Sequence, residues 1–186
     1  MRADALRNRT TILDTARALI AEVGPEASME EIATRAGVAV GTLYRHFPGK
    51  DELVAAVMAA SVDGIAIKIK AALRRAQAGA SPSQEIATLL EEIVDDTATL
   101  FAIKAVTGAT TVDQDAERAA TDAFAHLLDL ARDAGQIADD IGVDDVYLLL
   151  STAPANLPRP ARGRWLALVT RGLTTAPRRP QQRAAP

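Results

Sequence analysis

The sequence contains no cysteine among its 186 residues. This absence excludes disulfides, thiol nucleophiles and zinc sites built from thiolates. Only 3% of the residues are aromatic although 48% are hydrophobic, so the core must consist mainly of Ala, Leu, Ile and Val side chains. Because such a composition favours helices over strands, we expect an all-α fold.

Long apolar runs and an excess of positive charge are also absent. No run of 18 apolar residues is present, so we expect no transmembrane helix and no membrane partner. The N-terminal segment lacks the apolar core of a signal peptide, which predicts a cytoplasmic protein. The net charge of -3 gives no sign of nucleic-acid binding, so any DNA-binding surface must be local.

Catalysis finds little support in the sequence. The two histidines, His46 and His126, are expected on different helices, and no spacing of ligand residues matches a metal site. No glycine-rich phosphate loop follows a strand. We therefore expect no metal, no cofactor and no enzymatic activity.

The most informative stretch is 28–50, with the sequence SMEEIATRAGVAVGTLYRHFPGK. Ser28 followed three residues later by Glu31 is typical of a capping box at the start of a helix. Gly37 is expected to end this helix, and a second short helix follows over about 40–47. The pattern predicts two helices joined by a tight turn, the arrangement of a helix–turn–helix.

The second short helix has two different faces. At about 100° per residue, the larger side chains cluster on one side and predict a packed face formed by Val40, Leu43, Tyr44 and Phe47. The other side is small, polar and basic. In a helix–turn–helix this helix enters the major groove, where an arginine such as Arg45 binds guanine O6 and N7. The residues expected at the DNA are Arg9, Ser28, Val40, Gly41, Thr42, Tyr44, Arg45, His46 and Lys50.

Several of these assignments have an ordinary structural alternative. A short amphipathic helix pair with a glycine turn is, judged by pattern alone, more often plain packing than a DNA-binding unit. Val40 is either a core residue or a contact to a thymine methyl group, and Tyr44 is either half-buried or a phosphate contact. A lone histidine such as His46 is usually an ordinary surface residue. The coincidence of cap, turn glycine, apolar spacing and basic face in one register favours DNA binding.

Residues from about 8 to 58 resemble the DNA-binding head of TetR-type transcriptional regulators. The matching segments include 28–37 (SMEEIATRAG) and 41–47 (GTLYRHF), followed by Lys50. One departure is Ala39, which stands where the family often has Ser. The missing hydroxyl is expected to weaken the cap of the second short helix by about 0.5–2 kcal/mol.

The resemblance implies three partners: a double-stranded DNA operator, a second copy of the chain, and a small-molecule effector bound among the central helices. It also implies that the last two helices, expected over about 143–153 and 161–173, pair with those of the second copy. The residues expected at this interface are Leu149, Trp165, Leu166 and Val169. The family varies too much in this region for its pocket residues to be carried over.

Candidates for the pocket therefore come from this sequence alone. They are large or polar side chains of the central helices, each of which can equally be core: Phe101, Lys104, Phe124, Leu128 and Tyr147, with His126 as a further polar contact. One of these helices carries an acidic stripe formed by Glu91, Glu92, Asp95 and Asp96. It is interpreted as a solvated face, and a site for a cationic effector is the alternative.

The sequence predicts three regions. These are a helix–turn–helix domain over 1–52, a helical ligand-binding and dimerisation domain over 53–174, and a disordered, basic, proline-rich tail over 175–186. The function expected from them is a transcriptional regulator, a repressor released from a palindromic operator by a small molecule. The alternative, motivated by the lack of net positive charge, is a helical small-molecule-binding protein without operator binding.

Overall fold

The computed structural model describes residues 2–24, 26–107, 114–154 and 157–173, and every regular element within these ranges is a helix. The helices are α1 (Arg2–Val23), α2 (Met29–Ala36), α3 (Val40–His46), α4 (Lys50–Gln77), α5 (Pro82–Thr107), α6 (Gln114–Asp133), α7 (Val143–Ser151) and α8 (Arg159–Leu173). The expected all-α fold is confirmed. The predicted tail over 175–186 lies outside the described residues.

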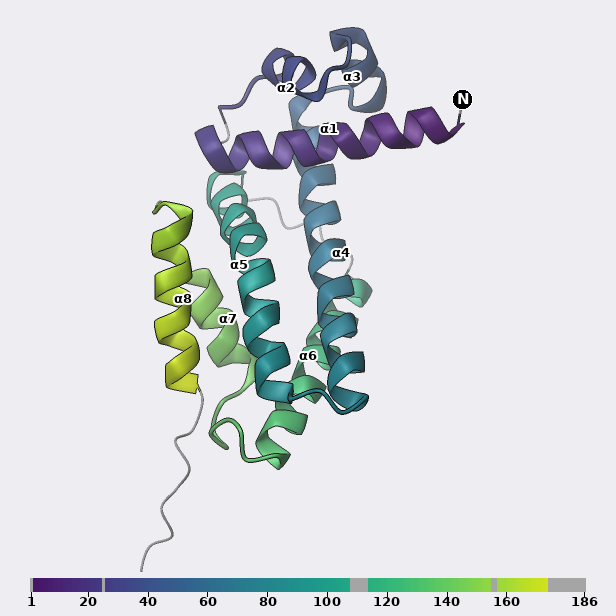
Figure 1. Cartoon of the computed structure of the whole chain (residues 1–186). Coiled ribbons are helices and arrows are strands. Elements are labelled where there is room, and N and C mark those ends of the chain that lie inside the picture. The colour runs from purple at the N-terminus through teal and green to yellow at the C-terminus, as the bar shows by residue number, and fades with distance from the viewer. Residues whose placement is uncertain (1, 25, 108–113, 155–156, 174–186) are drawn as a thin grey trace, which may run out of the picture.

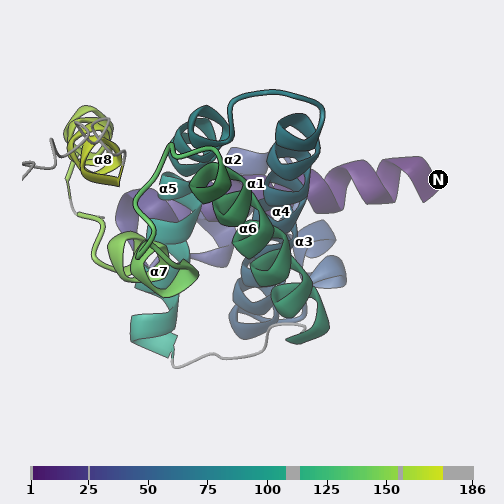
Figure 2. The same ribbon diagram turned by 90° about the horizontal axis from the view of Figure 1, so that it is seen from below.

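The helices form a small head on a larger body (Figure 1). α1 crosses the molecule, with α2 and α3 on one side of it and the body on the other. α4 runs from the head along the body, where it packs most extensively against α5 and α6. α7 and α8 lie on the side of α5 that faces away from α4, as the view from below shows (Figure 2). The head is therefore joined to the body mainly through α4, and α8 packs on α5.

α1 begins at Arg2, well before its first buried residue, Ile12. The segment before Gly24 contains neither glycine nor proline and is rich in Ala, Leu and Arg, which are strong helix formers. Gly24 has φ +83° and donates its N–H to the Ile20 carbonyl at 2.9 Å. This left-handed residue ends the helix.

Two capping residues define the ends of α2. Ser28 accepts a hydrogen bond from the Glu31 N–H through its Oγ at 3.1 Å. The Glu31 carboxylate lies 3.9 Å from Arg35, so its interaction is with its own helix rather than back toward Ser28. Gly37 adopts φ +67° and donates its N–H to the carbonyls of the last turn of α2. A side chain at this position would be strained, which explains the glycine.

Two separate hydrophobic cores support the head and the body. The head core includes Ile12 of α1, Ile32 of α2 and Leu43 of α3, each at most 1% exposed. It also includes Leu53 and Met58 of α4. The boundary expected at residue 52 thus falls inside the head core, because the first turns of α4 pack with the head and the later turns with the body. One rigid helix therefore belongs to both parts.

Within the part of the chain that the structure describes, no helix is both long and apolar enough to cross a membrane. The same residues contain no group of three or more His, Asp or Glu side chains arranged to hold a metal ion.

Candidate DNA-binding surface and ligand pocket

The packed face of α3 is narrower than the sequence predicts. Leu43 and Phe47 are buried, at 0% and 3% exposure, as expected. Val40 and Tyr44 are 39% and 41% exposed, so their assignment to the packed face is wrong. α3 has only seven residues and packs mainly against α2, so a single line of contact is buried and the neighbouring positions face solvent. Both side chains are consequently available on the outer surface of the head.

The outward side of α3 carries small, polar and basic groups. Arg45 is exposed and its Nη2 lies 3.5 Å from the Thr42 Oγ1. His46 is partly exposed beside Phe47, with 6.4 Å between the ring centroids. Gly41 is exposed, and a Cβ at this position would meet no protein atom within 4 Å. The fold therefore does not require a glycine here, whereas close approach of another molecule would.

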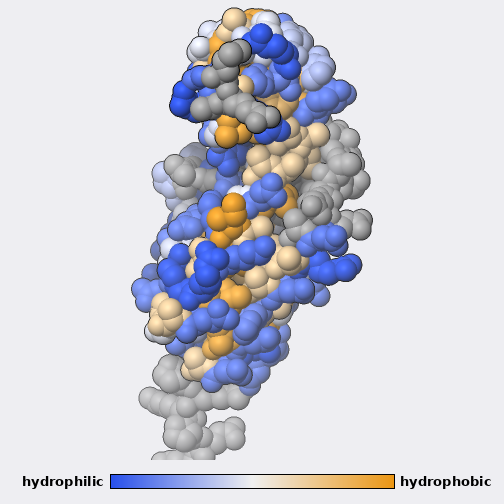
Figure 3. All heavy atoms as spheres, turned by 90° about the vertical axis from the view of Figure 1, so that its right-hand side faces the viewer, coloured by the Kyte–Doolittle hydropathy of each residue, from blue (hydrophilic) through white to orange (hydrophobic). Residues whose placement is uncertain are grey.

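The other predicted DNA-contacting residues flank α3 from the remaining helices of the head. The Arg9 guanidinium of α1 lies 5.4 Å above the ring of Phe47, a cation–π arrangement that places it beside α3. Lys50 is partly exposed as the first residue of α4, and Ser28 is exposed at the start of α2. On the face seen in Figure 3, hydrophilic residues surround the head end, and hydrophobic residues form a broken stripe along the body.

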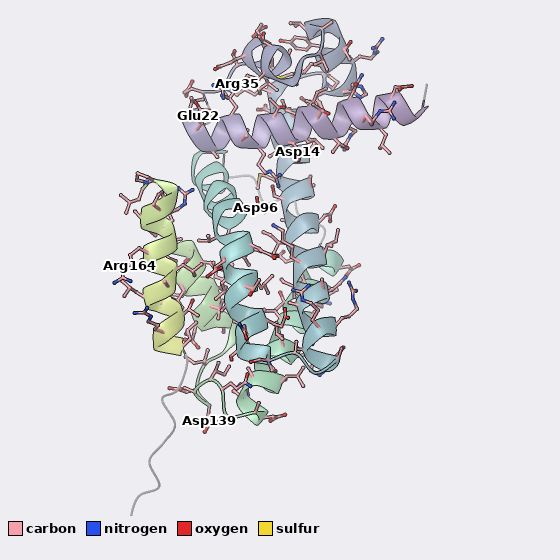
Figure 4. All side chains as sticks on the ribbon, in the orientation of Figure 1. Asp14, Glu22, Arg35, Asp96, Asp139 and Arg164 are labelled. Carbon is pink, nitrogen blue, oxygen red and sulfur yellow. The ribbon has the colours of Figure 1, made fainter. Side chains whose placement is uncertain are left out.

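An exposed ion pair fixes α2 against the end of α1. The Arg35 guanidinium binds the Glu22 carboxylate through two contacts, Nη1 to Oε2 at 2.5 Å and Nη2 to Oε1 at 3.3 Å. Hydrogen bonding and charge from Arg35 lower the pKa of Glu22, and the same contacts raise the pKa of Arg35. Figure 4 shows the two side chains meeting at the edge of the head. The pair joins α2 to the last turn of α1.

A second ion-pair cluster joins the head to the body. Asp96 of α5 binds Lys68 Nζ of α4 at 2.9 Å and Arg17 Nη1 of α1 at 3.3 Å. Lys68 also donates to the backbone carbonyl of Glu92 at 2.9 Å. The Asp96 side chain is only 19% exposed, so its assignment to a solvated face is wrong, whereas Glu91 and Glu92 are exposed. Close packing of α5 on α4 beneath α1 puts Asp96 between two cations (Figure 4).

The body contains a cavity of about 170 Å³ between α4, α5, α6 and α7. Phe124 and Tyr147 line it, as the sequence predicts. Leu128 is not among its lining residues and is 1% exposed in the body core, so the core alternative holds for this residue. His126 is exposed and does not line the cavity either. The side chains of Phe101 and Lys104 lie outside the described part of the structure. 

Sequence reasoning missed most of the cavity wall. The missed residues are small or medium-sized, and they include Val62, Ile65, Ile69, Leu90, Ile93, Thr97, Glu117, Ala120, Thr121, Val143, Val146 and Leu150. The sequence-based candidates were large or polar side chains of the central helices, so these residues were not among them. Their helical spacing alone resembles that of an ordinary core, and only the packing of four helices shows which positions surround a space.

The candidate dimer interface lies on α7 and α8. Leu149, Trp165 and Val169 are partly buried against the body core, and they stay predictions as interface residues. Leu166 is 2% exposed inside a single chain, so it supports the core and presents almost no surface to a second copy. The exposed apolar residues that the sequence did not single out are Leu148 and Leu168, at 62% and 52% exposure. Each lies two positions after a buried residue and thus on the opposite side of its helix.

Two family models match the sequence. Residues 12–57 match the model for bacterial regulatory proteins of the tetR family. Residues 81–175 match the model for the C-terminal domain of SbtR-like transcriptional regulators. The first match covers the helices that form the head, and the second covers α5 to α8 of the body.

Curated relatives match mainly through the head. The chain is 42% identical over 79 residues to the HTH-type transcriptional repressor KstR of Mycobacterium tuberculosis, covering 42% of this chain and 34% of that protein. It is 48% identical over 54 residues to an HTH-type transcriptional regulator of Staphylococcus aureus, covering 28% of this chain and 29% of that protein. The matches thus span about a third of these relatives' length. The relatives are transcriptional regulators rather than enzymes.

Solved structures match over nearly the whole chain. A TetR transcription regulatory protein from Mycobacterium vanbaalenii is 30% identical with a TM-score of 0.68, over 94% of this chain and 99% of that one. A TetR transcriptional regulator from Streptomyces coelicolor is 28% identical with a TM-score of 0.70, over 90% and 99%. From the head, the body and the matches to both, the chain belongs to the TetR family of bacterial transcriptional regulators.

Proposed function

We propose that the protein is a DNA-binding transcriptional repressor that acts as a homodimer in the cytoplasm. One α3 helix of each copy would enter the major groove at one half of a palindromic operator. A small molecule bound in the body cavity would favour a spacing of the two heads that does not fit the operator. Repression is supported by the match to KstR, which is described as a transcriptional repressor. The binding of an effector is supported by the body cavity.

The observation that carries the proposal is the outward face of α3. Thr42, Tyr44 and Arg45 project from a helix whose buried side is already accounted for by Leu43 and Phe47. Gly41 sits among them although the fold does not require it. These groups serve as a base-reading arginine, phosphate-binding hydroxyls and a point of close approach. Their contacts with DNA remain predictions of this proposal.

The test is sequence-preferring binding to the upstream region of the protein's own gene. Fluorescence anisotropy with a labelled duplex should show tight binding, and unrelated DNA should compete poorly. Arg45→Ala should weaken binding by about 1–3 kcal/mol, the value of one bidentate base contact. Tyr44→Phe should weaken it less, because only a phosphate hydrogen bond is lost.

The matched control is Arg74→Ala, which removes the same charge from the exposed end of α4 far from the head. Its affinity for the operator should equal that of the unaltered protein. Affinity should also fall steeply as salt rises, because phosphate contacts release counterions. Weak binding that ignores both sequence and salt would favour the alternative, a small-molecule-binding protein without an operator.

A further inference from the structure

The body cavity has an apolar floor and a polar rim. Buried side chains from three helices form the floor, among them Ile93, Phe124 and Val146, at 2–7% exposure. Glu117 and Tyr147, both exposed, lie at the rim. A ligand seated in this space would bury its apolar part against α5, α6 and α7 and keep one polar end near the rim.

The volume of the cavity limits the size of its ligand. An engineered protein cavity of about 150 Å³, lined by Leu, Ile and Phe, holds a single benzene molecule. The cavity here measures about 170 Å³ and has a similar apolar floor. Pockets for drug-sized molecules usually measure about 300–1,000 Å³. A single ring with a short substituent therefore fills this space, and a fused polycyclic molecule would have to extend past the rim.

The charge of the lining limits the chemistry of the polar end. Glu117 is the only charged residue among the described residues that line the cavity. Thr121 lies one helical turn after Glu117, and its hydroxyl already donates to the Glu117 backbone carbonyl at 3.0 Å. An anionic ligand would lose water beside a like charge, which is unfavourable. A cationic end would meet the Glu117 carboxylate as an exposed ion pair.

We infer that the effector of this protein is a compact, single-ring, hydrophobic amine. Its ring packs on the floor formed by Ile93, Phe124 and Val146, and its protonated nitrogen lies at Glu117. This inference rests on the proposed function only where it calls the ligand an effector. The cavity, its size and its charge do not depend on DNA binding.

The experiment compares three probes of the same size and different charge, namely benzylamine, benzyl alcohol and benzoate. Each is titrated into the full-length protein without DNA, and binding is followed by NMR shifts of the cavity methyl groups. Benzylamine should bind best, benzyl alcohol less well, and benzoate least. Equal binding of all three, or strongest binding of benzoate, would overturn the inferred charge preference.

Two kinds of variant locate the probe. Glu117→Gln should weaken the binding of benzylamine about two- to fivefold, the range expected for an exposed ion pair. The same substitution should leave the binding of benzyl alcohol unchanged. Asp122→Asn is the matched control, because Asp122 is an exposed acid of α6 that does not line the cavity. Ala120→Leu fills the buried wall and should abolish binding of all probes. If that variant does not fold, Val143→Phe fills the cavity from α7 and must give the same loss.

Release of DNA is measured separately from binding of the probe. If the protein binds its operator and benzylamine at saturation lowers that affinity, the effector assignment holds. If benzylamine binds in the cavity and the operator affinity does not change, the assignment as effector is wrong while the chemistry of the cavity stands. If no operator is bound, the proposed function fails and the probe titrations still decide the ligand class.

Discussion

Gly41 lies on the outward side of α3, where a Cβ would meet no protein atom within 4 Å. Glycine inside a helix costs about 0.5–1 kcal/mol relative to alanine because it has more freedom in the unfolded chain. We therefore expect Gly41→Ala to raise the free energy of unfolding by about that amount. The same methyl group should weaken operator binding, because the proposed function places the close approach of α3 to DNA at this residue.

Urea denaturation and anisotropy on the same preparation test both effects. Gly64→Ala is the control, because Gly64 lies inside α4 and also has open space at the Cβ position. It should gain similar stability without any change in DNA binding. Undiminished operator affinity in Gly41→Ala would show that α3 does not approach DNA at this residue.

The caps of α2 and α3 differ by one hydroxyl group. Ala39 is the N-cap of α3 with φ -64° and ψ 140°, and its side chain makes no capping hydrogen bond. Ala39→Ser should stabilise the protein by about 0.5–2 kcal/mol, because the new oxygen accepts a free N–H of the first turn. Ser28→Ala should destabilise it by a similar amount, because Ser28 already caps α2. Chemical denaturation without DNA measures both, and equal stability of the two variants would contradict the capping account.

At the scale of helices, Asp96 of α5 forms ion pairs with both α1 and α4. It also lies between Ile93 and Thr97, which line the cavity. Asp96→Asn should lower the free energy of unfolding by about 1 kcal/mol, because two charged hydrogen bonds weaken in a partly buried place. Operator affinity should fall as well, since the head is held less firmly on the body.

Glu91→Gln is the matched control for Asp96→Asn. Glu91 is an exposed acid on the same helix, so its loss should change neither stability nor operator affinity. Thermal unfolding and anisotropy give the two readouts. Unchanged stability of Asp96→Asn would mean that the ion-pair cluster contributes nothing net to the junction.

For the whole molecule, we expect the exposed apolar residues of α7 and α8 to decide whether two copies associate. Leu148 and Leu168 are more than half exposed in the single chain. Leu148→Glu combined with Leu168→Glu should shift the protein from dimer to monomer in analytical ultracentrifugation, because a paired interface cannot bury carboxylates without large cost. Operator binding should be lost with the dimer, since one head contacts only half of a palindrome.

Ile67→Glu serves as the control for the dimer test. Ile67 is 66% exposed on α4, away from α7 and α8, so the same change of side chain there should leave the dimer intact. Circular dichroism should show that all variants remain helical. If the doubly substituted protein is still a dimer at micromolar concentration, the interface lies on another surface.

The sequence by itself determined the elements that depend on local chemistry. Gly24 and Gly37 end helices because they adopt the left-handed conformation, and Ser28 begins α2 by accepting a backbone N–H. Leu43 and Phe47 were identified as buried from spacing alone. These features arise within a few residues of chain, so the sequence order suffices to predict them.

Only the tertiary structure decided the features that need distant segments to meet. Tyr44 is exposed because α3 has a single main neighbour, and Asp96 is paired because α1 and α4 meet it across 79 and 28 residues of chain. Gln136, after α6, accepts the Ser83 N–H at 2.9 Å and so caps α5 from a position 53 residues later in the chain. The spacing of one helix shows which positions share a face, whereas its neighbours decide whether that face meets a core, a cavity or solvent.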